Sequence, residues 1–213
     1  MTEAACPLCH SRDLQPWHED RQRSYLRCPQ CALVSVPARY HLKPADEKAV
    51  YDLHQNAPDD PGYRRFLSRV AEPLLQRLPG AASGLDFGCG PGPLLAEMLA
   101  SAGHAVALYD KFYFPDAGVL QGTYDFITAT EVVEHLEQPR AVLEQLSGLL
   151  RPAGWLAIMT KRVRDQAAFA RWHYIQDPTH IVFFADDTFV WLAQHLGCRL
   201  TVCGPDVVLL QKT

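Results

Sequence analysis

The sequence predicts an α/β fold: a largely parallel sheet with helices on both faces, closed by an antiparallel hairpin and preceded by a small cysteine-rich module. From Gly84 onward, short apolar segments alternate with helical patterns, as in doubly wound sheets. The last two strand candidates are separated only by residues 204–206, too few for a parallel crossover, so they should pair as a hairpin. Residues 1–35 are too few for a hydrophobic core of their own, which indicates a metal-stabilised module.

Length and composition indicate a globular protein without a strong charge pattern. The chain has 213 residues, 48% of them hydrophobic, and a net charge of −4. This balance predicts a buried core and disfavours a large surface for nucleic acid or membrane. The sequence has no apolar run long enough to span a bilayer, and it begins Met1-Thr2-Glu3 without a signal-peptide pattern. We therefore expect a cytoplasmic location and no membrane partner, while the oligomeric state is not predicted.

Four cysteines have the spacing of a structural zinc site. Two C-x2-C pairs, Cys6 with Cys9 and Cys28 with Cys31, are separated by 18 residues. Their four thiolates can close tetrahedrally on Zn²⁺ with no open position for chemistry. Redox motifs or disulfides are the alternatives, but a reducing compartment opposes disulfides and no βαβ pattern surrounds either pair. The sequence therefore predicts a zinc ribbon over residues 1–35.

A linker and a long helix are expected next. Residues 36–62 carry four prolines and read as a linker, with one short helix over residues 46–53. Residues 63–78 have apolar positions at helical spacing, with a kink expected at Pro73, and this helix should pack beside the sheet and cover its binding edge. The predicted division is therefore 1–35, 36–62 and a catalytic domain over 63–213.

The remaining strands and helices are predicted from the spacing of apolar residues and from the residues that begin or end such elements. The strand candidates are Leu85–Phe87, Ala105–Tyr109, Tyr124–Ala129, Trp155–Met159, Leu200–Cys203 and Val207–Leu210. The further helix candidates are Pro93–Ala102, Pro139–Leu150 and Asp187–Leu196. Pro139 suits a first helical turn, and Asp186 or Asp187 suits a helix cap.

A glycine-rich turn follows the first of these strands. Asp86 ends the strand, and the glycines at 88, 90 and 92 let the backbone approach a bulky ligand closely. A dinucleotide-binding turn would need a glycine at position 93, where Pro93 stands. The D-x-G-x-G-x-G order instead resembles motif I of class I methyltransferases that use S-adenosylmethionine (SAM). Asp110 ends the next strand, where an acid accepts hydrogen bonds from ribose hydroxyls; a turn acid or helix cap is the alternative.

Two later segments carry the same resemblance. Residues 124–136 (YDFITATEVVEHL) are similar to the strand and turn after motif II, and residues 150–155 (LRPAGW) to the loop before the fifth strand of these enzymes. The resemblance covers roughly residues 80–213 and implies a Rossmann-like domain with a seven-stranded sheet and bound SAM. The segment between Asp110 and Tyr124 is too short for the usual helix and third strand. The implied cofactor-binding residues are Asp86, Phe87, Gly88, Cys89, Gly90, Gly92, Tyr109, Asp110, Lys111 and Thr130.

A possible second metal site follows from the E-x-x-E-H sequence in the same turn. Glu131, Glu134 and His135 share one face of any helical turn. Small-RNA terminal 2′-O-methyltransferases and ubiquinone-pathway O-methyltransferases bind a divalent ion with this set, and in the RNA enzymes a later histidine completes it; the resemblance implies His180 in that role. Such an ion would hold vicinal hydroxyls and lower their pKa. The alternative is that His135 only caps or packs.

The aromatic segment over residues 172–180 should form a wall of the acceptor site. His173 or His180 could act there as general base, or could instead fix the loop through backbone hydrogen bonds.

Six basic and four acidic residues within 1–45 leave a net charge of only +2, which is weak for tracking phosphates. The basic residues are Arg12, Arg21, Arg23, Arg27, Arg39 and Lys43.

We therefore predict an enzyme that transfers a methyl group from SAM to an oxygen or nitrogen atom of a small molecule. A zinc-ribbon rRNA or tRNA methyltransferase is the first alternative. The second is a non-enzymatic zinc-binding adaptor that keeps the methyltransferase scaffold.

Overall fold

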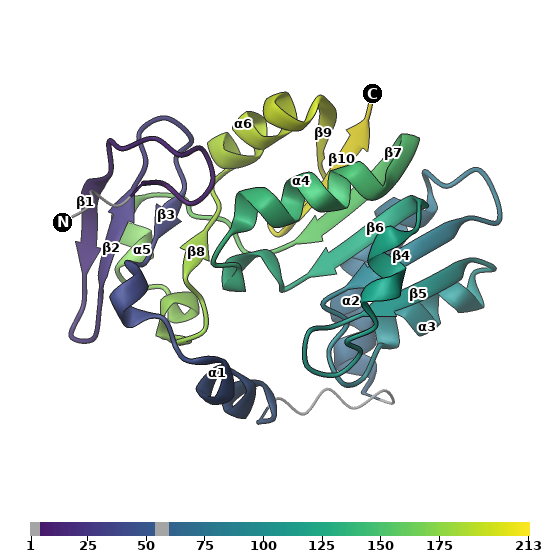
Figure 1. Cartoon of the computed structure of the whole chain (residues 1–213), viewed down its shortest axis with the longest axis horizontal. Coiled ribbons are helices and arrows are strands. Elements are labelled where there is room, and N and C mark those ends of the chain that lie inside the picture. Colours follow the sequence, from purple (N-terminus) through teal and green to yellow (C-terminus); the bar gives the residue numbers. More distant parts are fainter. Residues whose placement is uncertain (1–4, 54–59) are drawn as a thin grey trace.

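The computed structural model describes residues 5–53 and 60–213 and contains two sheets (Figure 1). The larger sheet has the strand order β5-β4-β6-β7-β10-β9, and the smaller has the order β1-β2-β3-β8. Residues 54–59 of the predicted linker lie outside the described part of the chain. Within the described part, no helix combines the length and the apolar character needed to cross a bilayer.

The larger sheet is parallel at its centre and antiparallel at one end. Its strands within the described residues are β4 (Ser83–Phe87), β5 (Ala105–Tyr109), β6 (Tyr124–Thr130), β7 (Leu150–Met159), β9 (Cys198–Val202) and β10 (Val207–Lys212). Strand β4 pairs in parallel with β5 and β6, and β6 with β7. Strand β10 runs antiparallel to both β7 and β9. The predicted fold class and closing hairpin are confirmed.

The strand count differs from the expected seven. The described residues give six strands, because the chain forms no strand between β5 and β6. A bridge joins Asp110 to Phe114, and a 3-10 turn follows over Ala117–Gln121. Asp116 caps that turn by accepting a hydrogen bond of 2.8 Å from the Gly118 N–H. Residues 110–123 are too few for a helix, a strand and the loops that would join them.

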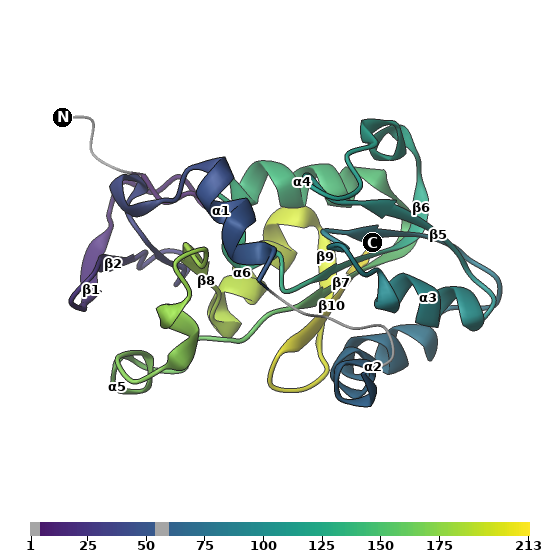
Figure 2. The same cartoon turned by 90° about the horizontal axis from the view of Figure 1, so that it is seen from below.

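Helices cover both faces of the larger sheet (Figure 2). Helices α2 (Pro61–Leu75) and α3 (Leu94–Ser101) bury their leucines against one face. Helices α4 (Pro139–Leu149) and α6 (Asp186–Leu196) pack on the other. Two apolar cores therefore enclose the sheet, and fully burying each Leu or Phe side chain contributes about 1.5–3 kcal/mol. This burial fixes the carboxyl ends of the parallel strands at one edge.

The helix boundaries follow the expected signals with small differences. Helix α2 begins where the Asp60 side chain accepts a hydrogen bond from the Gly62 N–H, and it continues through Pro73. Helix α4 has Pro139 in its first turn, as predicted. Helix α6 has Ala185 at its N-cap, so Asp186 and Asp187 occupy the first turn instead of the cap. Acidic side chains are also favourable there, because they face the positive end of the helix dipole.

The N-terminal ribbon, residues 5–36, forms the smaller sheet together with a strand from the far half of the chain. Its strands are β1 (Gln15–Glu19), β2 (Ser24–Arg27), β3 (Val34–Ser35) and β8 (Val182–Phe183). Strand β8 pairs antiparallel with β3. The rings of Tyr25 and Phe169 meet edge to face at 5.1 Å in the core that this sheet shares with α5 (Gln166–Phe169). The packing thus crosses the predicted boundaries at residues 35 and 63, and the division into domains stays a prediction.

The expected linker helix is present as α1 (Pro44–Tyr51), two residues earlier than predicted. It lies between the ribbon and the larger sheet (Figure 1). Three side-chain contacts tie it to the loop after β5. The Lys111 ammonium pairs with Glu47 at 2.7 Å, the Tyr113 hydroxyl donates to Asp52 at 2.6 Å, and the Lys48 ammonium lies 5.0 Å from the centre of the Tyr113 ring. The linker is therefore part of the wall around the strand ends.

Candidate active site and thiol cluster

The four ribbon cysteines converge as the sequence predicts. All four side chains are buried, and their sulfur atoms lie within 4.8 Å of one another. The Cys6 and Cys31 sulfurs are 3.6 Å apart, and those of Cys9 and Cys28 are 3.3 Å apart. Four sulfurs around one tetrahedral zinc are separated by roughly 3.8 Å, whereas a disulfide is far shorter. The arrangement fits a zinc ion and does not fit disulfides.

The backbone around these cysteines forms two similar turns. The His10 N–H donates to the Cys6 carbonyl at 3.0 Å, and the Ala32 N–H donates to the Cys28 carbonyl at 2.9 Å. The residue after each pair, His10 or Ala32, has a left-handed backbone with φ of 63° or 59°. This repeated turn aims both thiols of a C-x2-C pair at the same point. The hydrogen bond between Cys6 and Cys31 lowers the pKa of Cys6 and raises that of Cys31, so within this pair one sulfur is favoured as the thiolate that metals bind.

The carboxyl ends of β4, β5 and β6 border a cavity of about 640 Å³. Gly88 and Gly90 line it with φ of 73° and 64°, a conformation that a side chain would strain. A Cβ on Gly90 would meet no atom within 4 Å, so the space beside it is open. The Tyr109 carbonyl accepts hydrogen bonds from the N–H groups of Gly88 and Cys89 at 2.7 and 3.2 Å, which fixes the turn to β5.

Asp110 lies at the edge of this cavity and also holds its loops. One carboxylate oxygen accepts from the Gly90 N–H at 3.1 Å. The other accepts from the N–H groups of Phe112 and Tyr113 at 2.8 and 3.1 Å. A carboxylate has about four lone-pair sites, so capacity remains for a ligand hydroxyl. Both interpretations from the sequence, the ribose acceptor and the turn acid, are compatible with this position.

The other expected cofactor residues divide into two groups. Those that line the cavity are Phe87, Gly88, Cys89, Gly90, Tyr109, Asp110, Lys111 and Thr130. Two others, Asp86 and Gly92, are not part of its lining. The Asp86 side chain is 3% exposed and accepts a hydrogen bond of 2.6 Å from the Thr128 hydroxyl behind the turn. This buried hydrogen bond ties Asp86 to β6, so its observed role is to support the turn from behind.

Three of the four expected metal ligands lie close together beside the cavity. Possible ligand atoms of Glu134, His135 and His180 lie within 4.8 Å of one another. Glu134 is fully buried, and its Oε2 atom has no hydrogen-bond partner among the described residues. His135 and His180 also line the cavity. A buried carboxylate oxygen without a partner, beside two imidazoles, is a donor set suited to a divalent cation.

Both imidazoles are oriented by backbone carbonyls. The Nδ1 atom of His135 lies 3.1 Å from the Thr179 carbonyl oxygen, and that of His180 lies 2.7 Å from the Tyr174 carbonyl oxygen. Because a carbonyl only accepts, each Nδ1 carries the hydrogen and each Nε2 keeps its lone pair. Burial lowers the pKa of both histidines, that of His135 to about 3. Neutral imidazoles held in this way are typical of metal ligands.

Glu131 is not brought into this set. It has a left-handed backbone with φ of 51°, so the helical spacing that the sequence suggested does not extend to it. The 3-10 turn begins only at Val133 and carries Glu134 and His135. Glu131 instead approaches the set through Tyr174, whose hydroxyl lies 3.3 Å from Glu131 Oε2 and makes a short hydrogen bond to Glu134. Its own Oε1 atom has no partner among the described residues.

Tyr174 is the site residue that sequence reasoning missed. Its hydroxyl connects both glutamates and lies 3.3 Å from the Thr160 hydroxyl. Burial, followed by the charge of Glu134, raises its pKa, so it remains a hydrogen-bond donor. Burial also raises the pKa of Glu134 to about 8 and that of Glu131 to about 7. The available signal was its place in the aromatic segment after β7, but many aromatic residues in such segments only pack.

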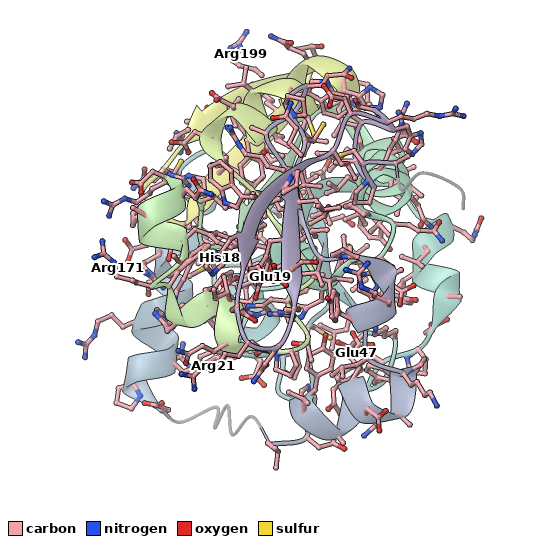
Figure 3. All side chains as sticks on the ribbon, turned by 90° about the vertical axis from the view of Figure 1, so that its left-hand side faces the viewer. His18, Glu19, Arg21, Glu47, Arg171 and Arg199 are labelled. Atoms are coloured by element: carbon pink, nitrogen blue, oxygen red, sulfur yellow. The ribbon has the colours of Figure 1, made fainter. Side chains whose placement is uncertain are left out.

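His173 lies apart from the site. Its exposed imidazole has Nε2 at 2.8 Å from the Lys161 ammonium, and it does not line the cavity. Of the two histidines considered as general base, only His180 therefore reaches the cavity. Figure 3 shows the ribbon side of the molecule, where Arg21, Glu19 and His18 lie on the β1–β2 hairpin in front of this segment.

Aromatic side chains complete the cavity wall. Tyr63 and Phe66 come from α2, as expected of the helix that should cover the binding edge, and Tyr51 comes from α1. The Tyr51 ring meets the His135 ring edge to face at 5.3 Å. Behind His135 lies a second cavity of about 430 Å³, bordered by the linker and by Lys111. The main cavity is thus lined by the glycine turn, by Glu131 and two imidazoles, and by aromatic side chains.

Comparison with known proteins identifies the family. A family model described as a methyltransferase domain matches residues 62–202, more than half of the 213 residues. The chain belongs to this methyltransferase domain family, and the predicted enzyme class is confirmed. The match includes every strand of the larger sheet except β10.

Curated relatives match over part of their length. The chain is 32% identical over 100 residues to a ubiquinone biosynthesis O-methyltransferase of Paraburkholderia xenovorans, covering 36% of this chain and 43% of that protein. It is 31% identical over 116 residues to the protein of the same name from Xanthomonas axonopodis pv. citri, covering 43% and 48%. The chain thus spans less than half of the length of these two relatives.

Solved structures share the fold at low sequence identity. A crystal structure of the Burkholderia thailandensis 1,6-didemethyltoxoflavin N1-methyltransferase, with its substrate and S-adenosylhomocysteine bound, aligns with a TM-score of 0.59 and 16% identity, covering 93% of this chain and 99% of that chain. CalO1, a methyltransferase of calicheamicin biosynthesis, aligns with a TM-score of 0.52 and 13% identity, covering 80% and 59%. These likenesses support the fold class.

Proposed function

We propose that this protein transfers a methyl group from SAM to an oxygen or nitrogen atom of a small molecule, beside a divalent cation held by Glu134, His135 and His180. The observation that carries the proposal is that one cavity is lined both by the glycine turn and by His135 and His180. Cofactor and acceptor would then meet in one space. The curated relatives named as O-methyltransferases support an oxygen acceptor.

The cavity fits SAM in size and chemistry. Bound SAM supplies an electrophilic methyl group on a positively charged sulfur. Asp110 would accept from the ribose, while the open backbone at Gly90 leaves room for the cofactor. The stacked rings of Phe87 and Tyr109, with centres 5.2 Å apart, offer apolar and π surface to an adenine or a sulfonium. These residues position the cofactor and exclude water, which promotes an in-line transfer.

The carboxylate and the two imidazoles would hold a divalent cation. A bound cation lowers the pKa of an acceptor hydroxyl and orients it. The unpartnered Oε2 of Glu134 and the two oriented Nε2 atoms supply the ligands. Tyr174 fixes Glu134 through its hydroxyl hydrogen bond. Glu131 remains a proposed participant through that same hydroxyl, on the cavity side of the cluster.

The four thiols of the ribbon would hold a structural zinc ion. Their buried, convergent sulfurs leave no open coordination position, so this ion would stabilise the ribbon and take no part in chemistry. Metal content measured on the purified protein should give one zinc per chain that resists mild chelation. A protein that is folded through residues 5–36 without zinc would contradict this assignment.

Calorimetry with SAM and S-adenosylhomocysteine tests the cofactor proposal directly. We expect both to bind with dissociation constants in the micromolar range, as a cofactor with polar and stacking contacts should. Transfer of labelled methyl from SAM to catechols and other vicinal diols then tests the acceptor class. Absence of binding at hundreds of micromolar would reject the enzyme and favour a non-catalytic scaffold.

A pair of histidine variants tests the cation. We expect His180→Asn to weaken Mn²⁺ binding by at least about tenfold, because it removes one of three ligands. The matched control is His173→Asn, a change in the same segment at an exposed residue outside the cavity. Binding can be followed by the electron paramagnetic resonance signal of free Mn²⁺. Equal affinity for Mn²⁺ in both variants would remove the cation from the proposal.

A further inference from the structure

One arginine of the ribbon is buried in the segment that carries His180. Arg23 follows the tip of the β1–β2 hairpin and is 5% exposed. Its guanidinium donates hydrogen bonds to four backbone carbonyls, those of Ile175 (2.6 Å), Asp177 (2.7 Å), His180 (3.0 Å) and Pro178 (3.3 Å). Its Nε–H donates to the Tyr25 hydroxyl at 2.9 Å. The N–H groups of the planar guanidinium thus hold one short loop, residues 175–180, in place.

The hairpin that carries Arg23 is itself tied down. The Tyr25 hydroxyl donates to Asp20 Oδ2 at 2.7 Å. The other Asp20 oxygen accepts from the Gln22 and Arg23 N–H groups at 2.7 and 2.8 Å. These hydrogen bonds among Asp20, Arg23 and Tyr25 hold the hairpin tip and the guanidinium in one orientation. Arg23 is therefore a rigid extension of the ribbon, and its charge is not available for phosphate contacts at the surface.

The loop fixed by Arg23 contacts every member of the candidate cation site. It supplies His180 itself, and its Thr179 carbonyl orients His135. Its Tyr174 hydroxyl bonds Glu134. At its end, the Ile181 N–H donates to the Glu134 carbonyl at 2.9 Å, while the Ile181 carbonyl accepts from Val36 of the ribbon at 2.8 Å. Ile181 thus connects the backbone of the ribbon to the backbone of Glu134, a candidate metal ligand.

We propose that Arg23 is a positioning residue for the cation site and that the ribbon exists to hold residues 174–181 in ligating geometry. The four thiols hold the ribbon together, and its strand β3 pairs with β8. Arg23 fixes the loop that precedes β8. The ribbon thus connects the thiol cluster rigidly to the cation site. The glycine turn and Asp110 stand on β4 and β5 and make no contact with Arg23. Loss of Arg23 should therefore weaken the cation site and spare the cofactor site. This inference depends on the cation site of the proposed function.

The test compares Arg23→Met and Arg23→Lys with Arg21→Met, all in the zinc-containing full chain. Arg21 is exposed on the same hairpin (Figure 3) and serves as the matched control. We expect Arg23→Met to raise the dissociation constant for Mn²⁺ by about 10- to 100-fold, the range for residues that orient metal ligands. Arg23→Lys keeps a charge and fewer donors, so it should fall between the two. Zinc content should stay at one equivalent, and SAM affinity should change by less than about twofold.

Two readouts separate positioning from general destabilisation. Amide hydrogen exchange should accelerate in residues 173–183 of Arg23→Met and stay unchanged in residues 85–110. Wild-type Mn²⁺ affinity in both Arg23 variants would overturn the inference, as would a parallel loss of SAM and Mn²⁺ binding. A wild-type protein that binds SAM but no Mn²⁺ would also overturn it, while leaving the methyltransferase proposal intact.

Discussion

The ribbon and the larger sheet reach stability by different means. In the sheet, two apolar cores built from α2, α3, α4 and α6 bury leucine and phenylalanine side chains on both faces. The ribbon has short strands, one of only two residues, and it surrounds four buried thiols, while its apolar side chains pack in cores shared with the rest of the chain. Hydrophobic burial scales with the amount of chain, whereas one metal ion can stabilise a unit of about 30 residues. We therefore expect the stability of the ribbon to depend mainly on metal binding, and that of the larger sheet on buried apolar area.

The difference also assigns the two units different tasks. The sheet gathers the ends of three strands, which suits a cofactor that needs a fixed, shaped edge. The ribbon reaches the site only through β8 and the loop before it. A change in one unit should thus affect one ligand and not the other. Four variants, each with a control, test the stability or the ligand binding of one unit.

Cys28→Ser should have the largest effect. Removing one of four thiolates should release zinc and unfold residues 5–36, because metal binding worth on the order of 10 kcal/mol supplies most of the folding free energy of such a unit. Zinc content and limited proteolysis report the loss, and SAM calorimetry should remain within about threefold of wild type. Cys203→Ser, outside the cluster, is the control. An intact, zinc-loaded ribbon in Cys28→Ser would contradict the metal-dependent account.

Gly84→Ala should damage the larger sheet. A Cβ at Gly84 would lie 2.1 Å from ring carbons of Phe126 on the neighbouring strand. Overpacking of this kind costs about 3 kcal/mol at the upper end of its usual range. In Gly148→Ala the new Cβ meets nothing within 4 Å inside α4, so that control should gain about 0.5–1 kcal/mol. Urea unfolding measures both; equal stability of the two variants would refute the packing argument.

Asp86→Asn should change how stability depends on pH. Burial raises the pKa of Asp86 to about 6, above its value of about 3.9 in the unfolded chain. The folded state therefore binds the proton more tightly, and this contribution, complete below about pH 4, is lost as pH rises through 6. Wild type should lose about 2.4 kcal/mol more than Asp86→Asn between pH 4 and 7.5.

Chemical denaturation at several pH values gives the two slopes. Asp116→Asn, at an exposed turn acid, is the matched control. Parallel curves for wild type and Asp86→Asn would show that this carboxyl does not titrate as its burial indicates. The result concerns the sheet alone, because Asp86 has no contact with the ribbon.

Asp110→Asn should have the smallest of the four effects. The amide keeps one acceptor oxygen for the loop but loses charge and one acceptor for the ribose. We expect SAM affinity to fall by about tenfold, or about 1.4 kcal/mol. Mn²⁺ affinity should not change, since the cation ligands lie in the 3-10 turn after β6 and in the loop before β8. Calorimetry measures the SAM affinity of Asp110→Asn, with Asp116→Asn as control. Unchanged SAM affinity would show that Asp110 only holds the turn and does not bind the ribose.

Local patterns in the sequence predicted the larger sheet well. Strand β5 was predicted with its observed bounds, and β4, β6 and β10 were each placed with small errors at their ends. Strands β4, β6 and β10 are mostly buried, so their apolar runs stand out between turn residues; β5 is an edge strand with exposed to half-buried residues, and turn residues on both sides mark its bounds. The count of seven came from the resemblance, and the sequence itself offered no segment for the missing strand.

The contacts that the sequence could not predict are those between distant segments. Strand β8 has two residues, too short for a period, and its pairing with β3 is set by the fold around it. Arg23 looked like a surface charge because arginine in a hairpin usually is one. Glu131 left the ligand set because its left-handed backbone breaks the helical spacing, and nothing local requires a glutamate to adopt it. Tyr174 was hidden among aromatic neighbours that only pack.

Strand β8 also determines when the ribbon can be finished during synthesis. Val34 pairs with Phe183, so the N-terminal sheet stays without its last strand until about 150 further residues have emerged from the ribosome. At about 5–20 residues per second, that interval lasts roughly 8–30 s. The cysteines are translated first and can capture zinc early, but the edge of β3 stays open throughout. A nascent chain stalled before residue 182 would therefore present an unpaired strand edge that chaperones can recognise.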